Sequence, residues 1–233
     1  MNRAQLNKST NIPFEIELNM QEKTLKKVWY GSIVLYIGTL AFAFGYNLYT
    51  KNYHSVGMAF VAVLTPCIVP LIFKLCHWNV VYEIYILSNV FTYFASVWGG
   101  ALDAYRLYGF DKALHFSSGW LITTAAVILY FTIKGDRKFQ SKREFAIFLI
   151  FINAVNMAVA QLWEFYEYVM LIFFKNDCIN HYTQGVHDSI TDMLCATVAG
   201  IGLTVFLVLY YKNGRRSFFV NIYEKFYDRN VGK

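Results

Sequence analysis

The sequence predicts an all-α, polytopic membrane protein: a bundle of about six transmembrane helices with both termini in the cytoplasm. Three observations predict this fold. Hydrophobic residues make up 57% of the 233 residues and charged residues only 15%, whereas soluble domains carry roughly 25% charged residues. Long apolar runs fill most of the chain, and the basic residues fall mainly on one side of these runs. We therefore expect a multi-pass protein of the cell membrane.

Six apolar runs have the length of about 20 residues that a helix needs to cross the hydrocarbon core. They are residues 28–49, 56–75, 80–102, 113–133, 145–174 and 189–211. None alternates with the period of a barrel strand, so helices satisfy the backbone hydrogen bonds. Pro66 and Pro70 predict an interruption in the second run. We expect the first run to be retained as a span and not cleaved as a signal peptide.

The distribution of Lys and Arg predicts the orientation. If the N-terminus lies in the cytoplasm and six spans follow, every Lys and Arg is cytoplasmic except four: Lys51, Arg106, Lys112 and Lys175. Such an excess of basic residues on one side is the positive-inside pattern, and it favours an even number of spans. The net charge of +6 is thus explained by topology. Because no basic stripe lies on a soluble element, we expect no nucleic-acid partner.

This topology divides the chain into three parts. Residues 1–27 form a polar cytoplasmic N-terminal arm, residues 28–211 form the transmembrane domain, and residues 212–233 form a cytoplasmic tail. In the tail, apolar residues from Phe218 to Tyr227 recur at a spacing of three to four, beside basic residues. This pattern predicts a short amphipathic helix lying on the anionic cytoplasmic leaflet.

The main functional signal is a set of ionisable residues within residues 103–192. Such residues are costly in spans and usually face the bundle interior or a wet cavity. Eight such residues fall at the extracytoplasmic ends of the last four expected spans: Asp103, Asp111, His115, Glu164, Glu167, His187, Asp188 and Asp192. A ninth, Glu83, lies outside this range and toward the cytoplasm. Three pairs have the i,i+3 or i,i+4 spacing that places both side chains on one helix face. The sequence therefore predicts one shared polar site.

The three pairs, Asp111 and His115, Glu164 and Glu167, and Asp188 and Asp192, contain five carboxylates. These five cannot all be ionised in a low-dielectric cavity without a compensating charge. A bound divalent cation would supply it, and a mixed set of Asp, Glu and His suits Zn, Mn, Fe or Mg. Shared protons, or pairing with Arg106 and Lys112, would also supply it. Helix capping explains Asp111 and Asp188 taken singly, but it does not explain His115 or Asp192.

The order of three motifs resembles a known family. The motifs are Asp111 to Phe116, Trp163 to Glu167, and Gln184-Gly185 followed by Asp188 to Met193. They resemble the YjdF-type family of bacterial membrane-spanning proteins, within a wider VanZ-like group. The YjdF-type family is largely of unknown function, and the VanZ-like group is associated with glycopeptide-type antibiotic resistance. The resemblance implies the signature residues Asp111, His115, Glu164, Glu167, Asp188 and Asp192.

Three functions stay open at this stage. The first is a membrane-embedded, metal-dependent hydrolase or transferase that acts on a lipid headgroup or a lipid-linked envelope precursor. In it, His115, Glu164, Asp188 and Asp192 bind the metal. Asp111 or Glu167 serves as general acid or base, and Arg106 and Lys112 meet an anionic headgroup.

The second function is a proton- or cation-coupled transporter. Transporter sites usually lie near the membrane midplane, between related halves of the chain, and here the polar residues are displaced outward. The third function is a non-catalytic envelope or resistance protein whose polar residues hold the helices together. Polar contacts within membranes stabilise a protein by only about 0.6 kcal/mol each. This is too little to offset the desolvation of so many carboxylates.

Overall fold

The computed structural model describes residues 3–232, and their side chains from Met20 onward. Within this part the chain is helical. The elements are α1 (Arg3–Tyr49), α2 (Tyr53–Leu64), the 3₁₀ turn η1 (Thr65–Cys67), α3 (Ile68–Leu75), α4 (Tyr82–Thr92), the π-helix η2 (Tyr93–Ala101), the 3₁₀ turn η3 (Ala104–Arg106), α5 (Phe110–Lys134), α6 (Lys142–Phe174), α7 (Val186–Asn213) and α8 (Phe218–Asn230).

Five segments of the described residues are long and apolar enough to cross a membrane: Met20–Tyr49, Tyr53–Leu75, Phe110–Lys134, Lys142–Phe174 and Val186–Asn213. They match five of the six expected spans. The remaining expected span, residues 80–102, is helical as well, but it is divided between α4 and η2. The structure confirms a helical chain with five candidate membrane-spanning helices among the described residues. A sixth span and the cytoplasmic position of both termini remain predictions.

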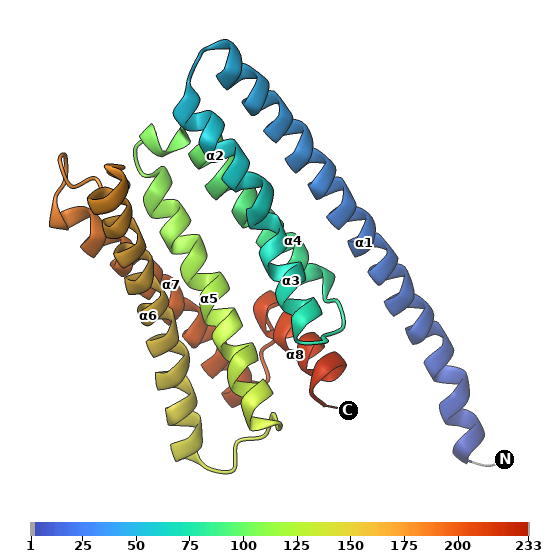
Figure 1. The fold of residues 1–233 in the computed structure, drawn as a ribbon. Helices are drawn as coiled ribbons and strands as arrows, with labels where there is room; N and C mark the ends of the chain where they lie inside the picture. The colour runs from blue at the N-terminus through green and yellow to red at the C-terminus, as the bar shows by residue number, and fades with distance from the viewer. Residues whose placement is uncertain (1–2, 233) are drawn as a thin grey trace.

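The helices form two groups (Figure 1). One group contains α1, α2–α3 and α4–η2, and the other contains α5, α6 and α7, which pack against one another in all three pairs. The start of α1 and the C-terminus lie toward the same end of the molecule, and α8 lies there between the two groups. We call this the α8 end. The start of α5, the end of α6 and the start of α7 meet at the opposite end (Figure 1), which we call the acidic end.

Pro66 interrupts the second span as the sequence predicts. It lies in η1, between α2 and α3. Proline has no N–H to donate to the carbonyl of Ala62, four residues earlier. The hydroxyl of Tyr36 on α1 donates to this carbonyl at 2.7 Å instead. The broken hydrogen bond is thereby replaced by a contact between α1 and α2.

Glycines bring α5 and α7 unusually close together. A Cβ on Gly119 of α5 would overlap the backbone carbonyl of Ala196 on α7. One turn further along α7, a Cβ on Gly200 would lie 2.5 Å from the amide nitrogen of Asn156 on α6. That amide donates to the carbonyl of Ala196 at 2.8 Å. Small residues at such crossings let helices in membranes pack backbone to backbone, and this crossing fixes the start of α7 against α5.

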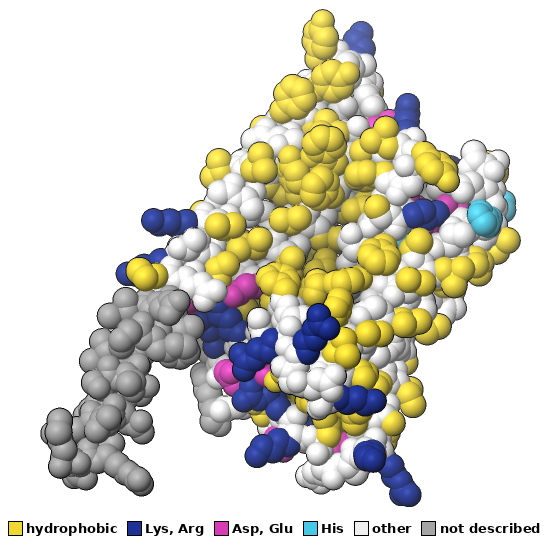
Figure 2. Space-filling view, turned by 180° about the vertical axis from the view of Figure 1, so that it is seen from behind, with side chains coloured by type: hydrophobic (Ala, Val, Ile, Leu, Met, Phe, Trp, Pro, Cys, Tyr) yellow, Lys and Arg dark blue, Asp and Glu magenta, His cyan; other side chains and the backbone are white. Residues whose placement is uncertain are grey.

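Apolar side chains fill the α5–α7 bundle between the crossing and the α8 end. Phe131, Phe148, Ile152, Leu203 and Leu207 are each at most 1% exposed and belong to one cluster. The outer surface of the molecule is also apolar. Figure 2 shows hydrophobic side chains over the middle of one face, whereas Lys and Arg side chains gather mostly toward the α8 end.

The tail forms the expected amphipathic helix, α8, but its apolar face contacts protein. Val220, Ile222, Tyr223, Phe226 and Tyr227 are all buried. The rings of Phe226 and Trp78 are 4.8 Å apart, and Tyr223 stacks on Phe131 at 5.5 Å. The expectation that this face lies in the lipid leaflet is therefore corrected. Aromatic side chains of the two helix groups offer it a binding surface that the sequence pattern does not reveal.

The N-terminal arm continues the first span as one helix. α1 runs from Arg3 to Tyr49 without interruption, so the boundary expected at residue 27 is not a break in secondary structure. Most of the arm's side chains lie outside the described residues. Near the boundary, Glu22 forms an ion pair with Arg229 of α8, which places this part of the arm at the α8 end.

Candidate functional site

Three helix ends supply the ionisable side chains of the acidic end. Asp111, Lys112 and His115 come from the first turns of α5, which begins after Gly109 in a left-handed conformation (φ 76°). Glu164 and Glu167 come from α6, and Asp188 and Asp192 come from α7. His115 and the four side chains from α6 and α7 are buried. The shared polar site predicted from sequence is thus assembled from α5, α6 and α7.

Lys112 lies at the centre of the site. Its Nζ is 2.5 Å from Oδ1 of Asp188 and 2.8 Å from Oδ2 of Asp192. It also lies 3.8 Å from Oδ2 of Asp111. The side chains of Asp188 and Asp192 are only 1% and 0% exposed. The only lysine in the cluster therefore neutralises the two most deeply buried aspartates.

His115 faces the other oxygens of two of these carboxylates. Its Nε2 is 3.6 Å from Oδ1 of Asp111 and 3.8 Å from Oδ1 of Asp192. Both separations are too long for a hydrogen bond. Asp111 and Asp192 thus each turn one oxygen toward Lys112 and the other toward the imidazole. Oδ1 of Asp192 is buried and has no hydrogen-bond partner among the described residues.

The spacing of these three atoms suits a metal ion. One ligand atom from each of Asp111, His115 and Asp192 can be chosen so that all lie within 4.8 Å of one another. Zinc binds His nitrogen and carboxylate oxygen at roughly 2.0–2.2 Å, so tetrahedral ligand atoms lie about 3.4 Å apart. The observed separations of 3.6 and 3.8 Å are close to this value. The donor set of two carboxylates and one imidazole fits a divalent cation.

Asp188 is fully engaged by other side chains. Its Oδ1 pairs with Lys112, and its Oδ2 accepts a hydrogen bond of 2.8 Å from the amide of Asn180. Asn180 lies in the loop before α7 in a left-handed conformation, with φ 50°. Sequence reasoning missed Asn180, because a lone loop asparagine eight residues before an aspartate gives no periodic signal.

The two glutamates of α6 differ from each other. Oε1 of Glu167 accepts a hydrogen bond of 2.8 Å from the indole of Trp163. Glu164 is 5% exposed, and neither of its carboxyl oxygens has a hydrogen-bond partner among the described residues. Glu164 is close enough to Asp188 and Asp111 to interact with them electrostatically, and Glu167 to Asp111 and Asp192. Both glutamates therefore belong to the same cluster.

A tyrosine and a cysteine lie beside the carboxylates. The pKa of Tyr105 is raised above its ordinary value because the hydroxyl is buried and lies near the negative charges of Asp111 and Glu167. Burial and the charge of Glu167 raise the pKa of the Cys178 thiol to about 11. Both groups are thus neutral near pH 7, which excludes Cys178 as a ready thiolate nucleophile.

Three residues expected near the site lie at its margin. Arg106 pairs with Asp103 at 2.6 Å, and the Arg106 side chain is 82% exposed. His187 is exposed on the first turn of α7. The structure thus brings together Asp111, Lys112, His115, Glu164, Glu167, Asp188 and Asp192, and leaves Arg106 outside. Lys112, expected to meet a headgroup, instead lies inside the cluster. Glu83 lies far away at the α8 end, paired with Lys225.

Apolar and aromatic side chains surround the acidic end. Tyr108 and Tyr182 in the connecting loops are largely exposed, as are Trp163 and Tyr166 on α6. Aromatic side chains of this kind are enriched where a membrane meets water. This pattern favours a position of the acidic end near a membrane–water interface.

Comparison with known proteins identifies the family. The family DUF2238, described as a predicted membrane protein, matches residues 31–213. This range includes four of the five candidate spans in full, most of the first span, and the whole acidic cluster. No curated protein and no solved structure matches the chain. The match confirms the YjdF-type resemblance, because that family is the one known as DUF2238, and it gives no support to the wider VanZ-like group. The chain belongs to the DUF2238 family of membrane proteins.

Proposed function

We propose that this protein is a membrane-embedded, metal-dependent hydrolase or transferase that acts on lipid headgroups or lipid-linked envelope precursors at the extracytoplasmic surface. The observation that carries the proposal is the arrangement of Asp111, His115 and Asp192. An imidazole nitrogen faces two carboxylate oxygens at 3.6 and 3.8 Å, distances that suit joint coordination of a cation better than direct hydrogen bonds.

In this proposal Lys112 and Asp188 are positioning residues. Lys112 holds one oxygen of Asp192 at 2.8 Å, which leaves the other oxygen free to face His115. Asp188, fixed by Asn180, holds Lys112 in turn. Partners of this kind orient ligands and tune a metal site. The roles differ from the sequence-based assignment at three residues, since Asp111 becomes a ligand, Asp188 supports the ligands, and Lys112 holds the aspartates instead of meeting a headgroup.

Glu164 and Glu167 supply the remaining chemistry. A divalent cation can activate a bound water or polarise a phosphoryl or carbonyl oxygen. Glu167, held by Trp163, is our candidate for the general acid or base. Glu164, whose oxygens have no partner among the described residues, is free to act as a further ligand or to orient the water.

The substrate class follows from the surroundings of the cluster. It lies at one end of three spans, and exposed aromatic side chains occur at the same end, so a substrate that enters from the lipid would present its polar headgroup there. Asp103 and Arg106 pair with each other at this margin. We keep Arg106 as the candidate contact for an anionic headgroup, because its side chain is the more exposed of the two.

A second candidate is a proton- or cation-coupled transporter. Glu164 favours it, because a buried carboxyl group without a partner is typical of proton relays in transport proteins. A transporter also needs a route to the other side. The buried layer of Phe131, Phe148, Ile152, Leu203 and Leu207 fills the α5–α7 bundle below the cluster, and this layer makes the enzyme the better-supported reading.

Metal analysis of the purified protein tests the proposal. We expect near-stoichiometric Zn, Mn, Fe or Mg in the wild type and loss of the metal in His115→Ala and Asp192→Asn. Asp103→Asn is the matched control, since it removes a carboxylate at the same end that belongs to an exposed ion pair. Folding of each variant is checked by size-exclusion chromatography.

Turnover then separates catalysis from binding. With envelope lipids as substrates, Glu167→Gln should retain the metal and lose at least about 100-fold in rate, as expected when a general acid or base is removed. Metal absent from the wild type after incubation with all four ions would refute the metal site. A loaded wild type that turns over no lipid, but carries protons or cations into proteoliposomes, would favour the transporter.

A further inference from the structure

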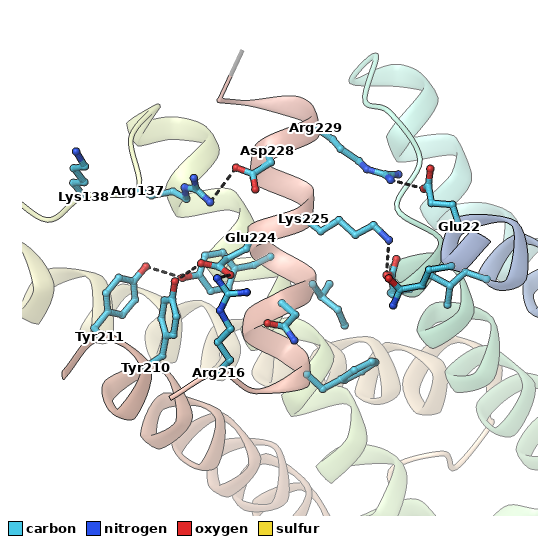
Figure 3. Close-up of a pocket in the computed structure, with 17 residues that line it drawn as sticks. Glu22, Arg137, Lys138, Tyr210, Tyr211, Arg216, Glu224, Lys225, Asp228 and Arg229 are labelled. Carbon is cyan, nitrogen blue, oxygen red and sulfur yellow. Dashed lines mark hydrogen bonds and ion pairs between the residues drawn. The ribbon is translucent and has the colours of Figure 1, made fainter. Parts of the chain in front are cut away.

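The α8 end contains a hollow of about 1280 Å³ around α8. Figure 3 shows Arg137, Lys138, Tyr210, Tyr211 and Arg216 on one side of this helix. Lys225 and Arg229 lie on its other side, together with Glu22. On one side of α8 each basic side chain has its own carboxylate partner, and on the other side basic side chains outnumber carboxylates. The excess of positive charge on the second side indicates a site for an anionic ligand.

On the side of Lys225 the charges are matched one to one. Lys225 Nζ is 2.6 Å from Oε1 of Glu83, and Arg229 pairs with Glu22. Arg229 also donates to the carbonyl of Val80 at 2.7 Å. These cations hold α8 against the first helix group, and their charges are balanced by Glu83 and Glu22.

On the opposite side three cations face two carboxylates. Arg137 pairs with Asp228 at 3.0 Å, an exposed carboxylate. Arg216, whose side chain is 70% exposed, reaches only to 3.9 Å from Glu224, and the same carboxylate accepts a hydrogen bond from the hydroxyl of Tyr210. Lys138 is exposed and has no ion-pair partner among residues 20–232. Positive charge is thus in excess here, which favours an anion.

Two features show what kind of anion fits this side of the hollow: its position at the ends of two spans and an exposed apolar side chain at its edge. Arg137 and Lys138 follow α5 by a few residues, and Arg216 follows α7, so all three lie just beyond the ends of two spans. Phe218, at the start of α8, lines the same hollow and is 55% exposed. A ligand that satisfies both features has a negative headgroup and an apolar tail.

We propose that the hollow between α8, the end of α7 and the α5–α6 loop binds the headgroup of an anionic phospholipid from the adjacent leaflet. Arg137, Lys138 and Arg216 contact the phosphate, and Phe218 contacts the acyl chains. Arginine forms paired hydrogen bonds with phosphate oxygens, and basic pockets beside spans are established sites for such headgroups. This site is independent of the proposed function at the acidic end.

Lipid titration of the detergent-purified full-length protein tests the proposal, with the midpoint of thermal unfolding as the readout. We expect phosphatidylglycerol to bind at least about tenfold more tightly than phosphatidylcholine, because each basic residue beside the headgroup adds to the attraction for an anionic lipid. The triple variant Arg137→Gln, Lys138→Gln, Arg216→Gln should lose this preference. The matched control is Lys142→Gln, Arg143→Gln, Arg215→Gln, which removes three exposed cations near the same end but outside the hollow.

Several outcomes would overturn the proposal. One is equal affinity for the two lipids, and another is an equal loss in the control variant, which would indicate attraction to surface charge alone. Inorganic phosphate is titrated in parallel, and protection by it as strong as that by phosphatidylglycerol would assign the hollow to a free anion. If the triple variant does not fold, Lys138→Glu replaces it, because that side chain is exposed and has no described ion-pair partner, so its loss disrupts no fold contact.

Discussion

The two ends of the molecule both carry many charged side chains but organise them differently. At the acidic end five carboxyl groups share Lys112 and His115, and Asp188 and Asp192 are at most 1% exposed. At the α8 end Lys225 pairs with Glu83 and Arg229 with Glu22, and these partners keep some contact with solvent. Lys112 and Lys225 themselves are similarly exposed, at 27% and 23%.

The difference separates the arrangement that we propose to be functional from one that holds the fold together. Matched, partly exposed ion pairs cost little and position a helix, which is what α8 needs to join the two helix groups. An excess of buried carboxylates carries a desolvation penalty that a single lysine does not offset. Such a cluster is retained where a ligand or a proton completes it.

The first and largest effect should come from removing the two comparable lysines. Lys112→Met leaves two buried aspartates without a counter-charge, and we expect it to lower the free energy of unfolding by about 3–5 kcal/mol. Lys225→Met breaks a partly exposed pair and should cost about 1 kcal/mol or less. Thermal or denaturant unfolding in detergent measures both, and equal losses would remove the distinction between the two ends.

The second effect concerns the close crossing of α5 and α7, which supports the acidic end and has no counterpart in the ion pairs of the α8 end. In Gly119→Ala the new Cβ would overlap the backbone of Ala196, so α5 and α7 must separate at a loss of about 1–3 kcal/mol. We expect weaker metal binding as well, because His115 lies one turn before Gly119. Gly202→Ala is the control, since its Cβ would lie 3.9 Å from Trp120, an ordinary contact. Unchanged stability of both variants would show that the crossing is not tight.

The smallest effect concerns the coupling within single ion pairs. A double-mutant cycle with Glu83→Gln and Lys225→Gln should give a coupling energy of about 0.5–1 kcal/mol. The same cycle on Asp103 and Arg106, with side chains 39% and 82% exposed, should give almost none. If the coupling between Glu83 and Lys225 is as small as that between Asp103 and Arg106, the ion pair does not hold α8 in place. The aromatic contacts of α8 would then account for its position.

Much of the acidic cluster follows from local sequence. The pairs Asp111 and His115, and Asp188 and Asp192, have helical spacing, and the order of apolar runs places them at one end. The assignment of individual roles does not follow. The sequence allows pairing of the carboxylates with Lys112, but it does not indicate that the ammonium of this residue reaches Asp188 and Asp192 on α7. Contacts between helices depend on rotation and crossing distance, which the period of a single helix does not fix.

For the tail helix, too, the sequence predicts the local structure but not the tertiary contacts. Its amphipathic pattern predicts a helix and an apolar face, both of which are present in α8. The pattern predicts equally well a face that lies in lipid and one that packs on protein, because both partners are apolar. Phe73, Trp78 and Phe131, far away in sequence, make the protein surface that covers it.

The sequence by itself determined that this chain is a helical membrane protein with its carboxylates gathered at one end, because apolar length and helical spacing are local properties. Only the tertiary structure decided which carboxylate oxygens face His115 and that Lys112 and Asn180 hold the aspartates. It also decided that the apolar face of α8 packs on the rest of the chain and not on lipid. These outcomes depend on how closely α5, α6 and α7 approach one another. That approach is set by the glycines and Asn156 at their crossing.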